Sequence, residues 1–292
     1  MLADFVKLEQ KHKVLDARFE VSGVDWKTSV LMSSDHHYDS VDCDRKMVKR
    51  HFDICKENDL PILIFGDFFD AMQGKSDKRS SKGALDPQLL RTSYINALVD
   101  QATEFLAPYA DNIIAWSPGN HETAIQKYAE VDLIELTADR IQGETGVEIP
   151  QMPYAGWIFF RGYKGNRLAD TIRMAYTHGS GGGGPVTKGT IQASRRANYL
   201  PDANIVVSGH IHESWTMEFN RERITTRGEL FQDTQWHICL PSYKDEYGES
   251  GNGWWHETGK SPRPKGAYWL DLSMYHDHSN NLRMALLPRR AI

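Results

Sequence analysis

The sequence predicts an α/β protein that folds as one domain. Apolar runs of strand length alternate along the chain with segments in which apolar residues recur at helical spacing. The 292 residues are enough for one large α/β domain with a sizeable core. Because no internal repeat and no clear linker divides the chain, we expect a single domain over 1–292.

The first elements are expected before residue 60. Residues 1–22 are polar and predict a helical extension that precedes the domain. The apolar run 29–33 predicts the first strand. Residues 42–58 predict a helix, in which Val48 and Phe52 fall roughly on one face.

A basic loop is expected between the second strand and the second helix. The continuous apolar run 61–65 is typical of a strand buried on both faces. Residues 73–86 are basic and rich in Ser and Gly, and they predict a loop. Asp86 is expected to cap, and Pro87 to begin, a helix that runs to about residue 106.

The rest of the chain continues as alternating elements and then turns to strands. Two further helices are expected, at 127–141 and 190–199. Strands are expected at 112–116, 157–161, 172–177, 205–208, 215–219, 235–240 and 268–272. The stretch 243–265 predicts an aromatic, loop-rich insertion.

Composition excludes several classes of protein. With 34 Lys+Arg, 39 Asp+Glu and 40% hydrophobic residues, the chain is typical of a soluble globular protein of net charge −5. No apolar run approaches the roughly 20 residues that span a bilayer, and the first residues lack a secretion signal, so no membrane partner is expected. Three widely spaced cysteines, Cys43, Cys55 and Cys239, indicate thiols in a reducing compartment, which favours a cytoplasmic location.

Five apolar runs end in short clusters of Asp, Asn and His. The clusters are Asp-His-His at 35–37, Gly-Asp-Phe-Phe-Asp at 66–70, Gly-Asn-His-Glu at 119–122, a lone His at 178 and Gly-His-Ile-His at 209–212. Ligands of α/β sheets gather outside the carboxyl ends of the strands, so we expect the clusters to converge. Carboxylates, an amide oxygen and imidazoles suit a divalent metal of intermediate hardness, and the lack of cysteine argues against thiolate zinc or iron–sulfur sites.

Each cluster has an ordinary alternative reading. A turn Asp beside a surface His, or a core histidine at 178, is common in chains without a metal. Gly179, Gly181 and Gly184 also satisfy the dinucleotide pattern G-x-G-x-x-G, but the following strand ends in Gly-His instead of an acid. His36 is expected away from the ligands and Glu122 in a structural hydrogen bond, whereas five clusters in one order favour a single site.

In this order the clusters resemble the five-block signature of the calcineurin-like metallophosphoesterase superfamily, D-x-H, G-D-x-x-D, G-N-H-D/E, H and G-H-x-H, from about residue 29 to 213. The glycine-rich block at 178–185 is similar to that of phage-borne members. The resemblance implies a four-layer α/β/β/α sandwich of two mixed sheets, with the site at one edge.

The resemblance also implies two metal ions bound by seven residues. The first ion would be held by Asp35, His37 and His212, the second by Asn120, His178 and His210, and both by Asp67. His121 would act as general acid beside the leaving group, and Asp70 would hydrogen-bond its ring. The ions would activate a shared water for attack on phosphorus. Mn²⁺ is the metal expected first, and Fe, Zn²⁺, Co²⁺ and Ni²⁺ also suit this donor set.

Phosphodiesters, including DNA or RNA, are the substrates that the sequence favours. Protein phosphatases of the superfamily carry a phosphate-binding Arg after the second block, where this chain has Ala71. The residues that could contact substrate are Lys75, Lys78, Arg79 and Arg195. The aromatic residues of 243–265 could stack bases or pack internally. A phosphomonoesterase or small-nucleotide hydrolase is the second hypothesis, and a non-catalytic scaffold, which would have lost ligands, is the third.

Overall fold

Two β-sheets packed face to face form the centre of the computed structural model, which describes residues 5–71, 89, 93–245, 247, 259 and 261–292. One sheet has the order β12 (Leu282–Ala291), β11 (Ala267–His276), β3 (Lys27–Ser33), β4 (Ile62–Phe65) and β5 (Ile113–Ser117). The other has the order β1 (Phe5–Lys11), β2 (Val14–Glu20), β6 (Ala155–Lys164), β7 (Arg167–Thr177), β8 (Ile205–Ser208), β10 (Leu230–Cys239) and β9 (Trp215–Ile224). Both sheets mix parallel and antiparallel pairs.

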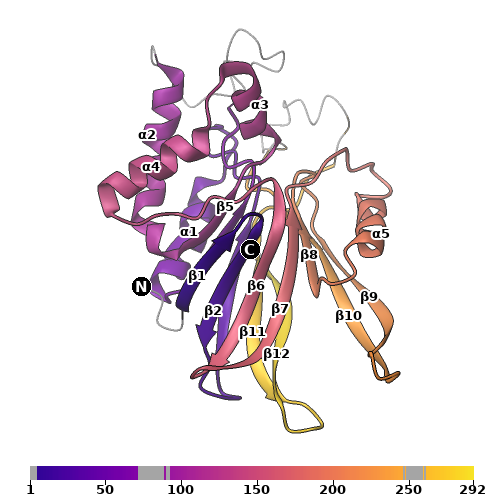
Figure 1. The fold of residues 1–292 in the computed structure, drawn as a ribbon. Coiled ribbons are helices and arrows are strands. Elements are labelled where there is room, and N and C mark those ends of the chain that lie inside the picture. Colours follow the sequence, from indigo (N-terminus) through magenta and orange to yellow (C-terminus); the bar gives the residue numbers. More distant parts are fainter. Residues whose placement is uncertain (1–4, 72–88, 90–92, 246, 248–258, 260) are drawn as a thin grey trace.

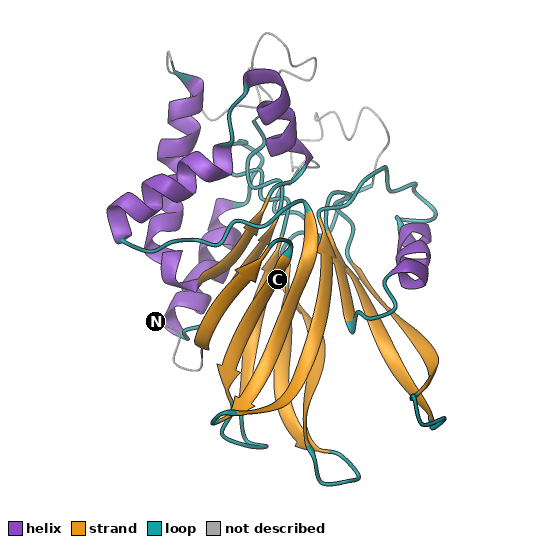
Figure 2. Ribbon diagram, in the orientation of Figure 1, coloured by secondary structure: helices purple, strands orange, loops and turns teal. Residues whose placement is uncertain are grey.

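Helices cover the outer faces, which confirms the predicted α/β/β/α layers (Figures 1 and 2). The five-stranded sheet carries α1 (Arg45–Glu57), α2 (Tyr94–Leu106), the 3₁₀ helix η3 (Ala107–Asn112), α3 (Asn120–Ala129) and α4 (Leu133–Thr145). The seven-stranded sheet carries α5 (Thr190–Tyr199). In the described part of the chain, no helix combines the length and apolar character needed to cross a membrane.

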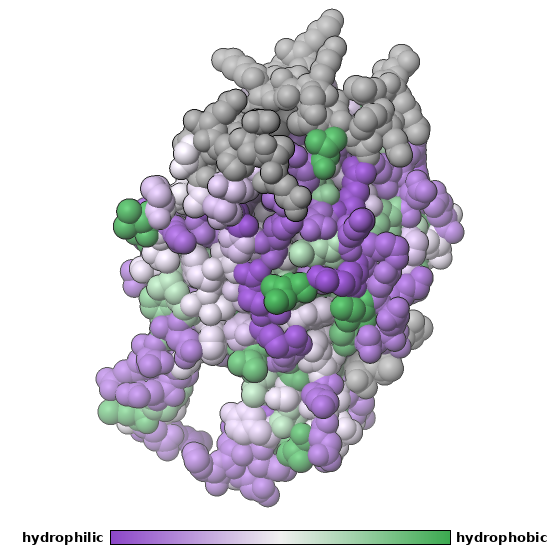
Figure 3. All heavy atoms as spheres, turned by 180° about the vertical axis from the view of Figure 1, so that it is seen from behind, coloured by the Kyte–Doolittle hydropathy of each residue, from purple (hydrophilic) through white to green (hydrophobic). Residues whose placement is uncertain are grey.

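Separate apolar clusters hold the layers together. Leu15, Ile158 and Met174 belong to the cluster between the sheets. Phe52 and Trp116 belong to the cluster between the five-stranded sheet and its helices. The face seen from behind is mostly hydrophilic, with hydrophobic residues scattered singly or in small groups (Figure 3).

The expected helical extension over 1–22 is wrong, because β1 and β2 form a hairpin there. Leu15, Ala17 and Phe19 are buried while the residues between them lie half-buried on the opposite face. This period of two is that of a strand, and β2 pairs in parallel with β6 inside the sheet.

Two further elements differ from the sequence expectations. The single helix expected at 127–141 is replaced by α3 and α4, because Glu130 adopts a left-handed conformation and Asp132 caps α4 by accepting hydrogen bonds from the N–H groups of Ile134 and Glu135. Strand β12, which was not predicted, pairs with β11 along its whole length. The three cysteines are free thiols, as the sequence indicates.

Candidate metal centre

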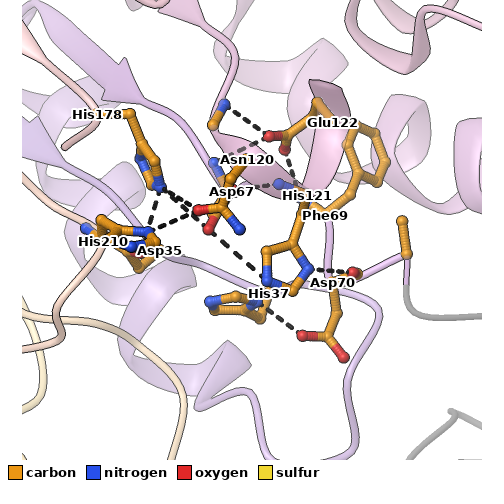
Figure 4. Close-up of polar contacts among 12 residues, drawn as sticks. Asp35, His37, Asp67, Phe69, Asp70, Asn120, His121, Glu122, His178 and His210 are labelled. Carbon is orange, nitrogen blue, oxygen red and sulfur yellow. Dashed lines mark hydrogen bonds and ion pairs between the residues drawn. The ribbon is translucent and has the colours of Figure 1, made fainter. Parts of the chain in front are cut away.

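The five predicted clusters meet at one end of the sandwich, in the loops that follow β3, β4, β5, β7 and β8 (Figures 1 and 4). Three neighbouring strands of one sheet and two of the other run parallel, so their carboxyl ends lie together. All seven predicted ligands lie in this region: Asp35, His37, Asp67, Asn120, His178, His210 and His212.

Asp35, His37 and His212 form the first group of donor atoms, all within 4.8 Å of one another. Nε2 of His37 lies 3.2 Å from Nε2 of His212, and the latter lies 3.3 Å from Oδ1 of Asp35. A divalent cation accepts lone pairs from both rings and from the carboxylate, so this donor set fits a metal ion.

Asp67, His178 and His210 form the second group, and the side-chain oxygen of Asn120 completes it. Nε2 of His178 lies 3.0 Å from Oδ2 of Asp67 and 3.2 Å from Oδ1 of Asn120, which is 2.6 Å from Nδ1 of His210. The groups adjoin, since Oδ1 of Asp35 is 3.9 Å from Nε2 of His178.

The buried charges favour a cation here. Burial alone would raise the pKa values of Asp35 and Asp67, but His178 and the other neighbouring histidines hold both pKa values well below the usual range. Burial would lower the pKa of His178, yet the two carboxylates raise it to about 10. The two buried carboxylates create a negative potential that attracts positive charge. A divalent ion would supply this charge in place of protons on the histidines.

Close backbone approach explains the glycines of two clusters. A side chain at Gly119 would clash with Asp67, and one at Gly209 would clash with Ser34 and Asp35. Glycine at both positions therefore lets loops from different strands pack directly against the carboxylate ligands.

Asp70 contacts two of the candidate histidines, one through its backbone carbonyl and the other through its carboxylate. The Nδ1 of His121 contacts the backbone carbonyl of Asp70, and the His121 backbone N–H donates to Oδ1 of Asp67 at 2.9 Å. The Asp70 carboxylate instead lies 2.7 Å from Nδ1 of His37 and 2.9 Å from Nζ of Lys244 (Figure 4). The backbone carbonyl of Asp70 thus orients the ring of His121, whereas its carboxylate contacts the candidate ligand His37 and the ammonium group of Lys244.

Lys244 and Asp39 are two residues that sequence reasoning missed. Lys244 follows β10, is 6% exposed and lies 174 positions from Asp70, so no local motif signals it. Buried Asp39 accepts hydrogen bonds from the backbone N–H groups of Asp70 and Ala71 and from the hydroxyl of Tyr94. These contacts fix the loop that carries Asp70.

Glu122 and His36 are buried supports of the centre. Glu122 accepts hydrogen bonds from the N–H groups of Asp67, Phe69 and Gly119, a structural role that agrees with the sequence expectation. Burial and the nearby Asp67 charge raise its pKa to about 7. His36 stacks on Tyr243 with ring centroids 4.9 Å apart, and burial lowers the pKa of His36 to about 3.

The expected substrate contacts remain predictions. Lys75, Lys78 and Arg79 lie outside the described residues, as does most of the aromatic insertion. Arg195 is exposed on α5, and Tyr243 is buried, which favours internal packing over base stacking for that ring.

The model of one family, the calcineurin-like phosphoesterases, matches residues 28–214. The chain belongs to this family. The match includes every strand-end cluster of the candidate metal centre. No match was found among curated proteins.

Several solved structures are similar to the chain at low sequence identity. Vps29 of Entamoeba histolytica, complexed with zinc, is 10% identical over 91% of this chain and 100% of that chain, with a TM-score of 0.37. A conserved uncharacterised protein of Streptococcus pneumoniae, described as a predicted phosphoesterase, is 11% identical over 90% and 99%, with a TM-score of 0.33. GAP50 of Plasmodium is 12% identical over 89% and 84%, with a TM-score of 0.44.

Proposed function

We propose that the chain is a metal-dependent hydrolase of phosphodiesters, including nucleic acid. The observation that carries the proposal is the convergence of seven metal-ligand side chains, with no ligand of the family pattern missing, beside the imidazole of His121. Two bound divalent ions would supply an activated water and neutralise the phosphate oxygens. Mn²⁺ remains the metal expected first.

Asp67 and His121 would have separate roles in the reaction. Oδ2 of Asp67 lies 3.0 Å from Nε2 of His178 in the second group, and the Asp67 carbonyl accepts a hydrogen bond from the backbone N–H of His37 in the first group, so its carboxylate would bridge them. The contact between His121 Nδ1 and the Asp70 carbonyl leaves Nε2, 3.8 Å from Oδ2 of Asp67, directed toward the donor cluster. Nε2 would donate a proton to the leaving oxygen, and a general acid in this role contributes a factor of about 10²–10⁴ to the rate.

The charges around the centre support a diester over a monoester. A phosphomonoester brings a second negative charge near neutral pH, which needs a further cation in the site. Buried Ala71 follows Asp70, and the ammonium of Lys244 is already paired with the Asp70 carboxylate. A singly charged diester therefore suits the described side chains better.

Hydrolysis assays test the proposal. The full chain with Mn²⁺ should hydrolyse bis-p-nitrophenyl phosphate faster than p-nitrophenyl phosphate, and chelator should abolish both activities. Single- and double-stranded DNA would then identify a nuclease. Faster hydrolysis of the monoester would favour a phosphomonoesterase. Metal binding without turnover of any phosphate ester would indicate a scaffold, and would overturn the proposal.

A further inference from the structure

A pocket of about 380 Å³ lies on the outer face of the seven-stranded sheet. It lies beside α5, the helix that Figure 1 shows next to β8. Its floor comes from β6, β7 and β8, where Trp157, Ala175 and Val206 pack in a cluster distinct from the core between the sheets. Helix α5 forms the wall with Gln192, Arg196 and Tyr199. None of the candidate metal ligands lines the pocket.

Arg196 is a buried cation in the wall of this pocket. The residue is 8% exposed, and within the described residues its side chain has no hydrogen-bond or ion-pair partner. By contrast, buried Lys244 is paired with Asp70, and half-buried Arg221 is paired with Asp233. Arg196 lines the pocket and lacks an opposite charge among the described residues, so an anion in the pocket would be attracted to its guanidinium group.

Helical spacing places the polar residues of α5 on the pocket side. Gln192 and Arg196 are four positions apart and therefore share one face of the helix, whereas the neighbouring Arg195 is exposed. This arrangement directs one of the two adjacent arginines to the sheet and the other to solvent.

The lining defines the chemistry of the occupant. It contains the cations Arg196 and Lys13 and no carboxylate, so it attracts an anion. It also contains the aromatic residues Trp157 and Tyr199, which offer apolar surface to a flat ring. A volume of about 380 Å³ lies within the range of small-molecule sites.

We propose that this pocket binds a small organic anion that contains an aromatic ring system and a phosphate or carboxylate group. Arg196 holds the anionic group, and the aromatic lining covers the ring. The site is separate from the metal centre, although Ser180, at its rim, lies in the loop that follows the candidate ligand His178. The proposal does not depend on the phosphodiesterase activity.

Calorimetric titration of the full chain tests the proposal with four probes: adenosine 5′-monophosphate, benzoate, inorganic phosphate and adenosine. Chelator prevents phosphate from binding through metal ions at the catalytic centre, and a repeat with Mn²⁺ shows whether binding persists. The monophosphate or benzoate should bind saturably, and more tightly than inorganic phosphate or adenosine. A preference between the first two identifies phosphate or carboxylate as the natural group. Saturable binding of neither would overturn the proposal.

Three variants locate the site. Arg196→Gln should weaken binding at least tenfold, because a charge-assisted hydrogen bond is lost. Arg195→Gln, on the exposed side of the same helix, is the matched control and should bind like the original chain. Gln192→Glu keeps the shape of a half-buried side chain and adds a negative charge beside Arg196, so it should also weaken binding of an anion. This variant tests the site even if Arg196→Gln fails to fold. Unchanged affinity in Gln192→Glu, or equal losses in both arginine variants, would contradict the assignment.

Discussion

Lys244 places an ammonium group inside the protein, and its removal tests whether the metal centre depends on that buried charge. Its Nζ lies 2.9 Å from Oδ1 of Asp70, and the same oxygen lies 2.7 Å from Nδ1 of the candidate ligand His37. The side chains of Lys244 and Asp70 are 6% and 7% exposed, so water has little access to replace a lost partner.

We expect Lys244→Met to lower the free energy of unfolding by about 3–5 kcal/mol, the usual cost of removing one partner from a buried ion pair. When Asp70→Asn is combined with it, the unpaired carboxylate is removed as well. The double variant should therefore lose less than the sum of the two single losses. Because Asp70 orients His37, we also expect Lys244→Met to weaken metal binding by about 10–100-fold.

Urea denaturation of the metal-free chain measures the first effect, and calorimetric titration with Mn²⁺ measures the second. Lys49→Met is the matched control, because Lys49 forms an ion pair with Asp53 at 2.6 Å but is 63% exposed. The control should leave stability and metal affinity essentially unchanged. A Lys244 variant as stable as this control, with full metal affinity, would refute the reasoning.

Three further predictions concern the centre itself. His121→Ala should keep both ions and lower turnover by about 10²–10⁴-fold, and loss of an ion in metal analysis would contradict its role as acid. Asp67→Asn should lose both ions, and full stoichiometry would refute the bridging assignment. The raised pKa of Glu122, about 7, means that the folded chain holds this proton more tightly than the unfolded chain. The metal-free chain should therefore lose stability relative to Glu122→Gln as the pH rises from about 5 to 8. A pH-independent difference in urea denaturation would argue against the raised pKa.

The candidate site could be predicted from the sequence because its signals are local. Each cluster directly follows an apolar run, and parallel strands bring such positions to one edge of the sheet. Strand β2 and the boundary between α3 and α4 were not predicted, because their local signals are weak. Strand β2 alternates in a segment that reads as polar overall, and the division of α3 from α4 depends on the left-handed Glu130 and the cap at Asp132.

The contacts of the Asp70 carboxylate could not be predicted, because they involve residues far apart in the sequence. Asp70 lies close to the rings of both His37 and His121, and the sequence does not indicate which of the two rings its carboxylate contacts. Lys244, 174 positions away in the sequence, contacts the same carboxylate oxygen as His37, and no local pattern indicates such a distant partner.

The backbone conformation of the candidate metal centre gives a second reason, besides metal binding, for the presence of Asp and His there. Five of the seven candidate ligands, Asp35, His37, Asp67, His210 and His212, have positive φ angles between 46° and 73°. Asp and His are enriched several-fold in this left-handed region relative to most residues with a β-carbon. The same side chains that can bind a metal therefore also tolerate the conformation that turns them inward after β3, β4 and β8. The fully buried strands β4 and β8 hold that conformation in place. Ligand geometry is consequently imposed by the sheets before any ion binds, and replacement of these residues by a β-branched side chain should disturb the fold as well as the chemistry.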